Sequence, residues 1–281
     1  VRKLEEQCSR TAVVDRLAVD FFSADVYARE IGTQQAKIVT SIAMFYDLED
    51  PNRFVADVKS VLDADGLWII QMSYLPLMLK TNEFGNICHE HLEYYSLQSL
   101  EYLLHLHGFE IVDLEMNDIN GGSLRAYIRN RGVAPENFGD ATYRAMAADR
   151  VRDLREAEFK LGLSERQVYD EFATRVERIK RDTVRYVRNA VAEGKKVYVY
   201  GASTKGNTVL QYFGLDQTLI TAAAERNPDK WGRVTVGSNI PIVSEAEARA
   251  ANPDYFLVLP WHFLQEFMAR EHDYLYGGGR F

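Results

Sequence analysis

The densest group of proton-handling side chains lies in residues 86–96, which contain two histidines, two glutamates, one cysteine and two tyrosines. Histidine and glutamate are common general acids and bases because their surroundings can move either pKa toward neutrality. The run therefore predicts that His89 or His91, together with Glu90, accepts a proton or orients a substrate. The alternative is a structural network in which buried His and Glu side chains pair with each other.

A metal site is not expected at this run. His89 and His91 alternate across an extended backbone, so a single strand cannot direct both side chains at one ion. No HExxH pattern and no nearby pair of cysteines supplies further ligands. The prediction for the chain is accordingly that it binds no metal.

The segment from Gly201 to Asn207 is a candidate anion site. It directly follows an apolar strand and opens a helix, where backbone amides and the helix N-terminus bind anions, and Lys205 with two hydroxyls strengthens this interpretation. Contact with a phosphate or nucleotide is the leading interpretation, and a merely tight turn is the alternative. NAD is disfavoured because Ser203 stands where a dinucleotide fingerprint needs a second glycine.

Two weaker signals accompany these runs. Arg125 follows a Gly-Gly turn and is placed to pair with a phosphate or carboxylate, although the glycines also fit a plain hairpin loop. His262 follows a predicted strand that ends at Pro260, and α/β sheets bind ligands at such carboxyl edges. Core packing is the better interpretation for the neighbouring Trp261.

The elements that must position these residues alternate between strand and helix. Residues 36–44 and 67–72 are apolar runs typical of buried strands, and the helix between them begins at Asp50-Pro51. Ser96 is a cap for a helix that stops at Gly108, and residues 109–115 and 123–128 alternate as strands of an antiparallel hairpin. Residues 18–25 are expected to form a further strand that ends at Asp25.

The second half of the chain predicts long helices followed by another α/β unit. Apolar residues recur at helical spacing through residues 135–193. This unit begins with a strand at 195–201, a glycine-rich turn and a helix. It continues with a strand at 219–224, which leads into Glu225, and a strand at 254–260. The predicted domains are a first α/β domain at 1–132, a helical connector at 133–193 and a second α/β domain at 194–281.

Composition narrows the possible functions. The 281 residues carry a net charge of −8, and a surface of this kind disfavours nucleic acid as a partner. The two cysteines are too few for a disulfide framework, which favours a reducing cytoplasm. No apolar run approaches the roughly 20 residues that a membrane span needs, and no signal peptide opens the chain. The oligomeric state is left open.

Taken together, these motifs resemble the S-adenosylmethionine-dependent C-methyltransferases that act on nucleotide-linked deoxysugars in antibiotic pathways. The resemblance rests on residues 20–25, the Cys-His-Glu-His-Leu-Glu-Tyr-Tyr-Ser run, and residues 121–125, 201–207 and 257–263, in this order. It implies an α/β fold: a partial class I methyltransferase (Rossmann-like) sheet with an antiparallel C-terminal hairpin, a helical connector and a second Rossmann-like α/β domain. The implied substrate is a nucleoside-diphosphate sugar.

The resemblance also implies a reaction and roles for single residues. A base removes the proton beside a keto group, and the resulting enolate takes the methyl group, so His91 is the expected base and Glu90 its partner. Tyr94 or Tyr95 is placed to donate to the enolate oxygen. The remaining assignments are cofactor binding by Asp25, Ser41 and Phe45, and substrate binding by His89, Arg125, Ser203, Thr204, Lys205, Asn207 and His262.

The sequence departs from the family pattern at several positions. Cys88 stands where members carry tyrosine, and Phe45-Tyr46 stands where they carry a histidine. The zinc-binding cysteines and the glycine-rich cofactor loop are not visible, so the chain reads as a fragment of a longer protein. The alternative function is therefore a catalytically incomplete nucleotide-sugar-binding fragment. A nicotinamide oxidoreductase built on residues 195–225 is a third, disfavoured interpretation.

Overall fold

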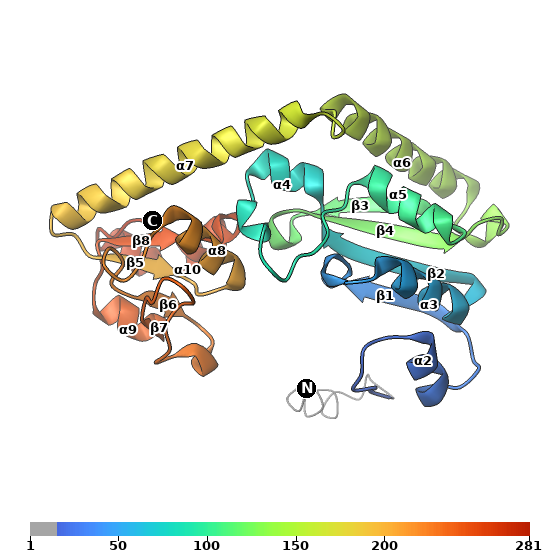
Figure 1. Cartoon of the computed structure of the whole chain (residues 1–281), viewed down its shortest axis with the longest axis horizontal. Coiled ribbons are helices and arrows are strands. Elements are labelled where there is room, and N and C mark those ends of the chain that lie inside the picture. The colour runs from blue at the N-terminus through green and yellow to red at the C-terminus, as the bar shows by residue number, and fades with distance from the viewer. Residues whose placement is uncertain (1–15) are drawn as a thin grey trace. The chain divides into compact units, whose positions relative to one another are not determined.

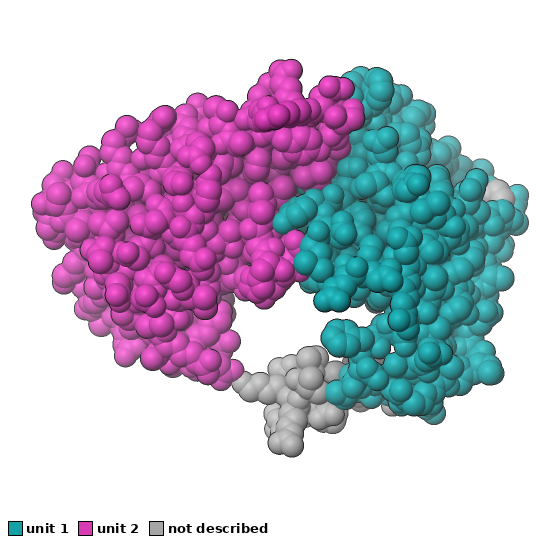
Figure 2. Space-filling model, in the orientation of Figure 1, with its two compact units in different colours: residues 1–74, 92–117, 123–160 teal, residues 75–91, 118–122, 161–281 magenta. Residues whose placement is uncertain are grey.

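The computed structural model describes residues 16–281, which fold as two compact units (Figures 1 and 2). Unit 1 contains the residues up to 74 together with 92–117 and 123–160. Unit 2 contains residues 75–91, 118–122 and 161–281. Two short segments of the first half of the chain thus belong to the same unit as its C-terminal part.

Unit 1 is built on a mixed four-stranded sheet with the order β1-β2-β4-β3. Strands β1 and β2 are parallel, whereas β4 runs antiparallel to both β2 and β3. The strands span Ala36–Ile42 (β1), Leu62–Ser73 (β2), Phe109–Asn117 (β3) and Ser123–Asn130 (β4). The predicted partial sheet, in which parallel strands are followed by an antiparallel hairpin, is confirmed.

Local sequence explains where the two helices that pack on this sheet begin (Figure 1). At the start of α3 (Pro51–Val61), the Asp50 side chain accepts a hydrogen bond from the backbone N–H of Arg53 at 3.0 Å, and proline occupies the first turn. At the start of α5 (Leu97–Leu106), Ser96 and Ser99 form a reciprocal capping box. Both helices occur where the sequence predicts them.

The core of unit 1 is aromatic at its centre. Trp68 on β2 is fully buried, and its ring lies 5.9 Å from that of Phe45 and 5.5 Å from that of Phe109. Apolar side chains of α3 and α5 complete the core: Val55, Val58, Val61, Leu97, Leu100, Leu103 and Leu104. Phe45 lies in a short 3-10 turn, η1 (Phe45–Asp47), directly after β1.

The predicted strand at residues 18–25 is wrong. Its apolar side chains are largely exposed, with Phe21 94% exposed, although the Phe22 ring lies 5.2 Å from that of Phe54, and no described strand pairs with it. Instead, α2 (Ala24–Glu30) begins here, because the Ser23 side chain accepts a hydrogen bond from the backbone N–H of Val26 at 3.2 Å. A strand needs hydrogen bonds from a neighbour, whereas a capped helix meets its own.

Two long helices, α6 (Ala141–Leu161) and α7 (Arg166–Ala192), occupy the region predicted to be helical. Helix α6 ends just before Gly162, whose φ of +70° is a conformation that glycine adopts readily. Within unit 1, α6 is fixed to β3 because Arg150 makes two 2.8 Å bonds to the buried Asp113 carboxylate. Asp113 also accepts a hydrogen bond from Tyr143 at 2.6 Å.

Unit 2 contains a parallel four-stranded sheet with the order β7-β6-β5-β8. Along the chain this order reads third, second, first, fourth, so the connections reverse direction between β5 and β8, which is where open α/β sheets bind ligands. Three strands match the predictions, and β7 with the helices after it was not predicted. The elements are β5 (Val197–Tyr200), α8 (Thr204–Phe213), β6 (Ala223–Glu225), β7 (Ile242–Ser244), α9 (Glu245–Ala250), β8 (Tyr255–Val258), α10 (Leu264–Arg270) and α11 (His272–Tyr276).

Shorter elements complete unit 2. From the first half of the chain come α4 (Leu75–Thr81), η2 (Phe84–Asn86) and η3 (Ile119–Gly121), and from its C-terminal part come η5 (Pro228–Lys230) and η6 (Trp261–Phe263). A further 3-10 turn, η4 (Pro135–Asn137), lies in unit 1. Within residues 16–281, no helix is both long enough and apolar enough to cross a membrane.

Candidate active site

His91 is held in one tautomer by the backbone. Its Nδ1 lies 2.9 Å from the carbonyl oxygen of Asn86, at the end of η2. A carbonyl oxygen only accepts hydrogen bonds, so Nδ1 must carry the proton that is donated. Nε2 of the neutral ring is therefore the nitrogen that can take up a proton. The ring is half-buried, which is suitable for a base that must be both fixed and accessible.

The neighbours of His91 face solvent. His89 and Glu90 are exposed in a turn at residues 88–90, and Cys88 is a half-buried free thiol. The run is a turn and loop, so the alternation expected of a strand does not apply to its histidines. Within residues 16–281, no three His, Cys, Asp or Glu side chains gather as metal ligands.

The second predicted run begins α8. The Ser203 hydroxyl accepts a hydrogen bond from the backbone N–H of Gly206 at 3.1 Å and so caps the helix, which leaves Thr204 in the first turn. Burial lowers the pKa of Lys205, while the nearby Glu83 carboxylate and Cys88 thiol act in the opposite direction. Lys205 is thus a partly buried cation that an anionic ligand would stabilise.

The two predicted runs meet within unit 2. A Cβ placed on Gly85 would lie 3.2 Å from the backbone oxygen of Lys205 and 3.4 Å from its Cβ, so η2 and α8 are in close contact. Cys88 lies near enough to Lys205 to influence its pKa, so the loop before His91 is next to the first turn of α8. In that turn, Oδ1 of Asn207 is buried without a hydrogen-bond partner among the described residues. A buried polar atom of this kind favours a ligand or ordered water.

Aromatic packing adds two further segments. The Phe84 ring lies 5.4 Å from Phe213 of α8 and 5.9 Å from Trp261 of η6. η6 also contacts η3, which contains the first glycine of the Gly-Gly turn. Four runs that are far apart in sequence therefore lie around one part of unit 2. The side chain of His262, a predicted substrate ligand, lies outside the described part of the structure.

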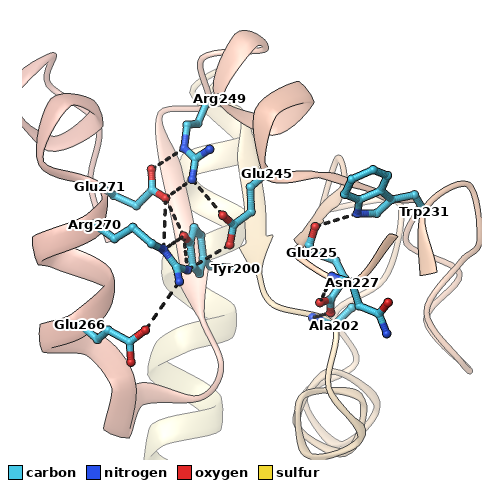
Figure 3. A network of polar contacts seen from close by, with 10 residues as sticks. All are labelled: Tyr200, Ala202, Glu225, Asn227, Trp231, Glu245, Arg249, Glu266, Arg270 and Glu271. Atoms are coloured by element: carbon cyan, nitrogen blue, oxygen red, sulfur yellow. Dashed lines mark hydrogen bonds and ion pairs between the residues drawn. The ribbon is translucent and has the colours of Figure 1, made fainter. Parts of the chain in front are cut away.

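A pocket of about 360 Å³ opens at the carboxyl ends of β5, β6 and β8. The turn at Gly201–Ser203 and Glu225 line it. The Glu225 carboxylate accepts hydrogen bonds from the backbone N–H of Ala202 at 3.1 Å and of Asn227 at 2.9 Å (Figure 3). Burial would raise the pKa of Glu225, but these amides and Lys230 hold it below its ordinary value.

One wall of this pocket is a charged network that orders the end of unit 2 (Figure 3). Arg270 donates to the Tyr200 hydroxyl at 2.7 Å and to Glu245 at 3.0 Å, and Tyr200 donates to Glu271 at 2.6 Å. Burial would raise the pKa of Glu271, but Arg249 and Tyr200 lower it further than burial raises it. These groups satisfy one another, so the network is structural.

The residues predicted to bind the cofactor lie in unit 1. Ser41 is buried, and its hydroxyl accepts a hydrogen bond from the Trp68 indole at 3.1 Å, while the Phe45 ring is in the core. Their side chains face inward, so a ligand would meet the backbone at this end of β1. Ala43, between them, has a φ of +54°, a strained value for alanine. Asp25 is exposed in the first turn of α2.

Two other predicted residues have protein surroundings. Arg125 on β4 donates to Gln71 at 2.6 and 2.9 Å and to Glu115 at 3.2 Å, so a ligand would have to compete with these partners. Tyr94 is half-buried. Its neighbour Tyr95 is buried, its hydroxyl has no partner among the described residues, and burial together with Glu93 raises its pKa.

Sequence reasoning missed Glu83 and Glu225 as residues of the site. Glu83 is 4% exposed and precedes η2, and nothing in its sequence context indicates that it lies near Lys205. Glu225 could have been found, because an acidic residue at the end of the second strand, about 20 residues after the glycine turn, is a known feature of nucleotide-binding α/β units.

Comparisons with known proteins match both halves of the chain to methyltransferases. A family model described as a C-methyltransferase C-terminal domain matches residues 118–281, and one described as a methyltransferase domain matches residues 4–114. The C-methyltransferase NovU of Streptomyces niveus is 35% identical over 262 residues, which are 92% of this chain and 60% of NovU. The chain therefore spans about three fifths of the length of this relative.

Solved structures are more distant. The chain matches a structure titled a pericyclic reaction enzyme with a TM-score of 0.30 and 15% identity, over 35% of this chain and 27% of that chain. It matches magnesium protoporphyrin IX methyltransferase from Synechocystis PCC 6803 with a TM-score of 0.28 and 14% identity, over 34% of this chain and 46% of that one. TM-scores at this level do not establish a shared fold.

Proposed function

The chain belongs to the C-methyltransferase family, and from this premise we propose that it methylates a carbon next to the keto group of a nucleoside-diphosphate deoxysugar. The observation that carries the proposal is the His91 ring, whose Nδ1 is fixed on the Asn86 carbonyl in a loop packed against the start of α8. This arrangement joins an oriented base to an anion-binding turn.

His91 is the proposed base. With the proton held on Nδ1, Nε2 removes the acidic proton beside the keto group, and the positive ring is stabilised by the Asn86 carbonyl dipole. Glu90 is exposed on the same turn and is the proposed partner for a substrate hydroxyl or for the charged ring. Tyr94 is proposed to donate to the enolate oxygen.

The nucleotide is proposed to bind at the start of α8. Lys205 supplies the charge, Ser203 and Thr204 supply hydroxyls, and the buried Oδ1 of Asn207 is an acceptor for a ligand N–H or O–H. His89, Arg125 and His262 are proposed to contact the sugar. Arg125 does so only after exchanging a bond to Gln71 or Glu115.

S-adenosylmethionine is the proposed cofactor, and it supplies an electrophilic methyl group when bound. The residues of unit 1 fit it through the backbone, because the side chains of Ser41 and Phe45 face the core and Ala43 strains the chain at the carboxyl end of β1. Asp25 is exposed and available to hydroxyl groups of the cofactor. A cytoplasmic location stays a prediction from cysteine usage.

Proton exchange at the substrate tests the base directly. In D2O with S-adenosylhomocysteine and a thymidine-diphosphate 4-keto-deoxysugar, the wild-type chain should exchange the proton beside the keto group, as measured by NMR. His91→Ala should slow both this exchange and methyl transfer by about 10²–10⁴-fold, the usual contribution of a general base. His105→Ala, an exposed histidine of α5, is the matched control. Exchange that persists in His91→Ala would assign the base elsewhere.

The second candidate is a nucleotide-sugar-binding chain without catalysis. It is favoured by the fact that the Lys205 turn, Asn207 and the Glu225 pocket all lie in unit 2. Calorimetric titration separates the two functions. Binding of both S-adenosylhomocysteine and thymidine diphosphate supports the methyltransferase, and binding of the nucleotide alone supports the second candidate. Binding of neither ligand would contradict both.

A further inference from the structure

A buried arginine in unit 1 has no partner for its charge. Arg129, near the end of β4, is 3% exposed, and its guanidinium makes no hydrogen bond or ion pair with any described residue. Its Nη2 in particular is buried without an acceptor. Burying a charge without a counter-charge is costly, so a group that supplies one would be bound favourably.

Arg150, in the same unit, is an arginine whose guanidinium is paired with a carboxylate. It reaches β3 from α6 and makes two 2.8 Å bonds to the Asp113 carboxylate. The residue opposite Arg129 in the β3–β4 register is Glu110, which forms no ion pair with it. Arg129 therefore differs from Arg150 in lacking the forked carboxylate contact that its planar group favours.

Arg129 lines a cavity of about 340 Å³ between the edge of the sheet and one face of α6. From α6, the residues Arg144, Ala148, Val151 and Arg155 line it at helical spacing, and Phe138 adds an aromatic ring. Arg155 is neutralised by Glu101 at 2.6 Å. The remaining charges are those of Arg129 and Arg144 against Glu110, which leaves a net charge of about +1.

The cavity lies at the opposite end of the sheet from the proposed cofactor edge. Arg129 follows Ile128, which pairs with Trp68 in the middle of β2, whereas Ser123 at the other end of β4 pairs with Ser73 at the carboxyl end of β2. The six residue-to-residue steps from Ser123 to Arg129 span roughly 20 Å of strand at about 3.3 Å per step. Ligands of α/β sheets bind at carboxyl ends, so this is a different site.

We propose that this cavity binds a small organic carboxylate, with the carboxylate on the Arg129 guanidinium and an apolar body against Phe138 and Val151. The net charge of about +1 matches one carboxylate better than a phosphate dianion. The mixed lining, charged at one end and apolar over the rest, is typical of sites for small organic ligands.

Fluorine NMR of the whole chain with 4-fluorobenzoate as the probe tests the proposal. We expect saturable broadening of the probe resonance with wild-type protein, and no effect with the neutral 4-fluorobenzamide. Arg129→Met should weaken binding at least tenfold, whereas Arg131→Met, on an exposed arginine two residues later, should leave it unchanged. Binding equal in Arg129→Met and wild type would overturn the proposal.

A second variant keeps the test valid if Arg129→Met does not fold. Ala148→Phe fills the cavity from α6 and retains Arg129, and it should also abolish broadening, with folding checked by circular dichroism. Inorganic phosphate should not displace the probe at equal concentration. Displacement by phosphate, or undiminished binding in a folded Ala148→Phe protein, would contradict a carboxylate site in this cavity.

Discussion

At the scale of single residues, the chemistry of this chain depends on which atoms the backbone fixes. The Asn86 contact to His91 is made by a backbone carbonyl, so a substitution of the Asn86 side chain keeps this bond as long as η2 forms. Lys205 is different, because its properties come from burial beside Glu83 and Cys88. The Asn86 carbonyl thus fixes which nitrogen of His91 carries the proton, whereas burial lowers the pKa of the Lys205 ammonium group.

The lowered pKa of Lys205 predicts how nucleotide affinity depends on pH. A lysine binds a diphosphate only while it is protonated, so affinity for thymidine diphosphate should fall as pH rises through a pKa below the ordinary value of 10.5. Lys205→Arg should remove this alkaline limb, because arginine stays charged. Lys205→Ala should weaken binding about 10- to 100-fold at neutral pH, as expected for loss of a charged hydrogen bond.

Calorimetric titration between pH 7 and 10 measures this dependence. Lys195→Arg is the control, since Lys195 is exposed and paired with Asp254. If the alkaline limb were unchanged in Lys205→Arg, the titrating group would be another residue.

At the scale of elements, the free backbone N–H groups at the start of a helix donate hydrogen bonds to side chains that are either close to the helix or distant from it in sequence. Ser96 and Ser99 cap α5 locally. The buried Glu158 of α6 also accepts hydrogen bonds from the backbone N–H of Leu97 and of Gln98, in addition to the Tyr74 hydroxyl. A carboxylate at a helix N-terminus is stabilising because of the helix dipole.

Glu158→Leu should therefore destabilise the protein. It leaves two backbone donors and the Tyr74 hydroxyl without an acceptor, and the expected loss is about 1–3 kcal/mol in the free energy of unfolding. Chemical denaturation followed by circular dichroism measures it. Glu156→Leu, on an exposed glutamate of the same helix, should change stability by less than about 0.5 kcal/mol. Equal effects of the two substitutions would mean that the Glu158 bonds contribute nothing.

At the scale of the whole molecule, the two units divide the proposed tasks. The residues proposed to hold the cofactor are in unit 1, and the proposed base and nucleotide turn are in unit 2. Unit 2 is discontinuous, since it takes residues 75–91 and 118–122 from the first half of the chain. The predicted domain boundaries at residues 132 and 193 stay a prediction.

Hydrogen exchange with mass spectrometry should show this division. Thymidine diphosphate should slow exchange in residues 83–91 and 201–207, and S-adenosylhomocysteine should slow exchange in residues 36–47, because bound ligands suppress local opening. The strand core around Trp68 is already buried and serves as the internal reference. Nucleotide protection confined to residues 36–47 would contradict the proposed assignment.

The sequence by itself determined most of the regular structure. Capping residues such as Asp50 and Ser96 act within a few positions of themselves, so the starts of α3 and α5 could be read from local order. Long apolar runs likewise predicted β1, β2 and β5. The strand predicted at residues 18–25 was wrong. The prediction rested on the pattern of apolar and acidic residues within this segment, whereas a strand also needs a partner strand from elsewhere in the chain.

Only the tertiary structure decided the surroundings of the site residues. The sequence singled out the runs containing His91 and Lys205, but not that η2 packs against α8 at Gly85. It did not indicate that Ser41 faces Trp68, nor that Arg129 is buried beside a cavity. Burial, charge environment and close backbone approach arise from contacts between residues far apart in the chain, which local patterns do not contain.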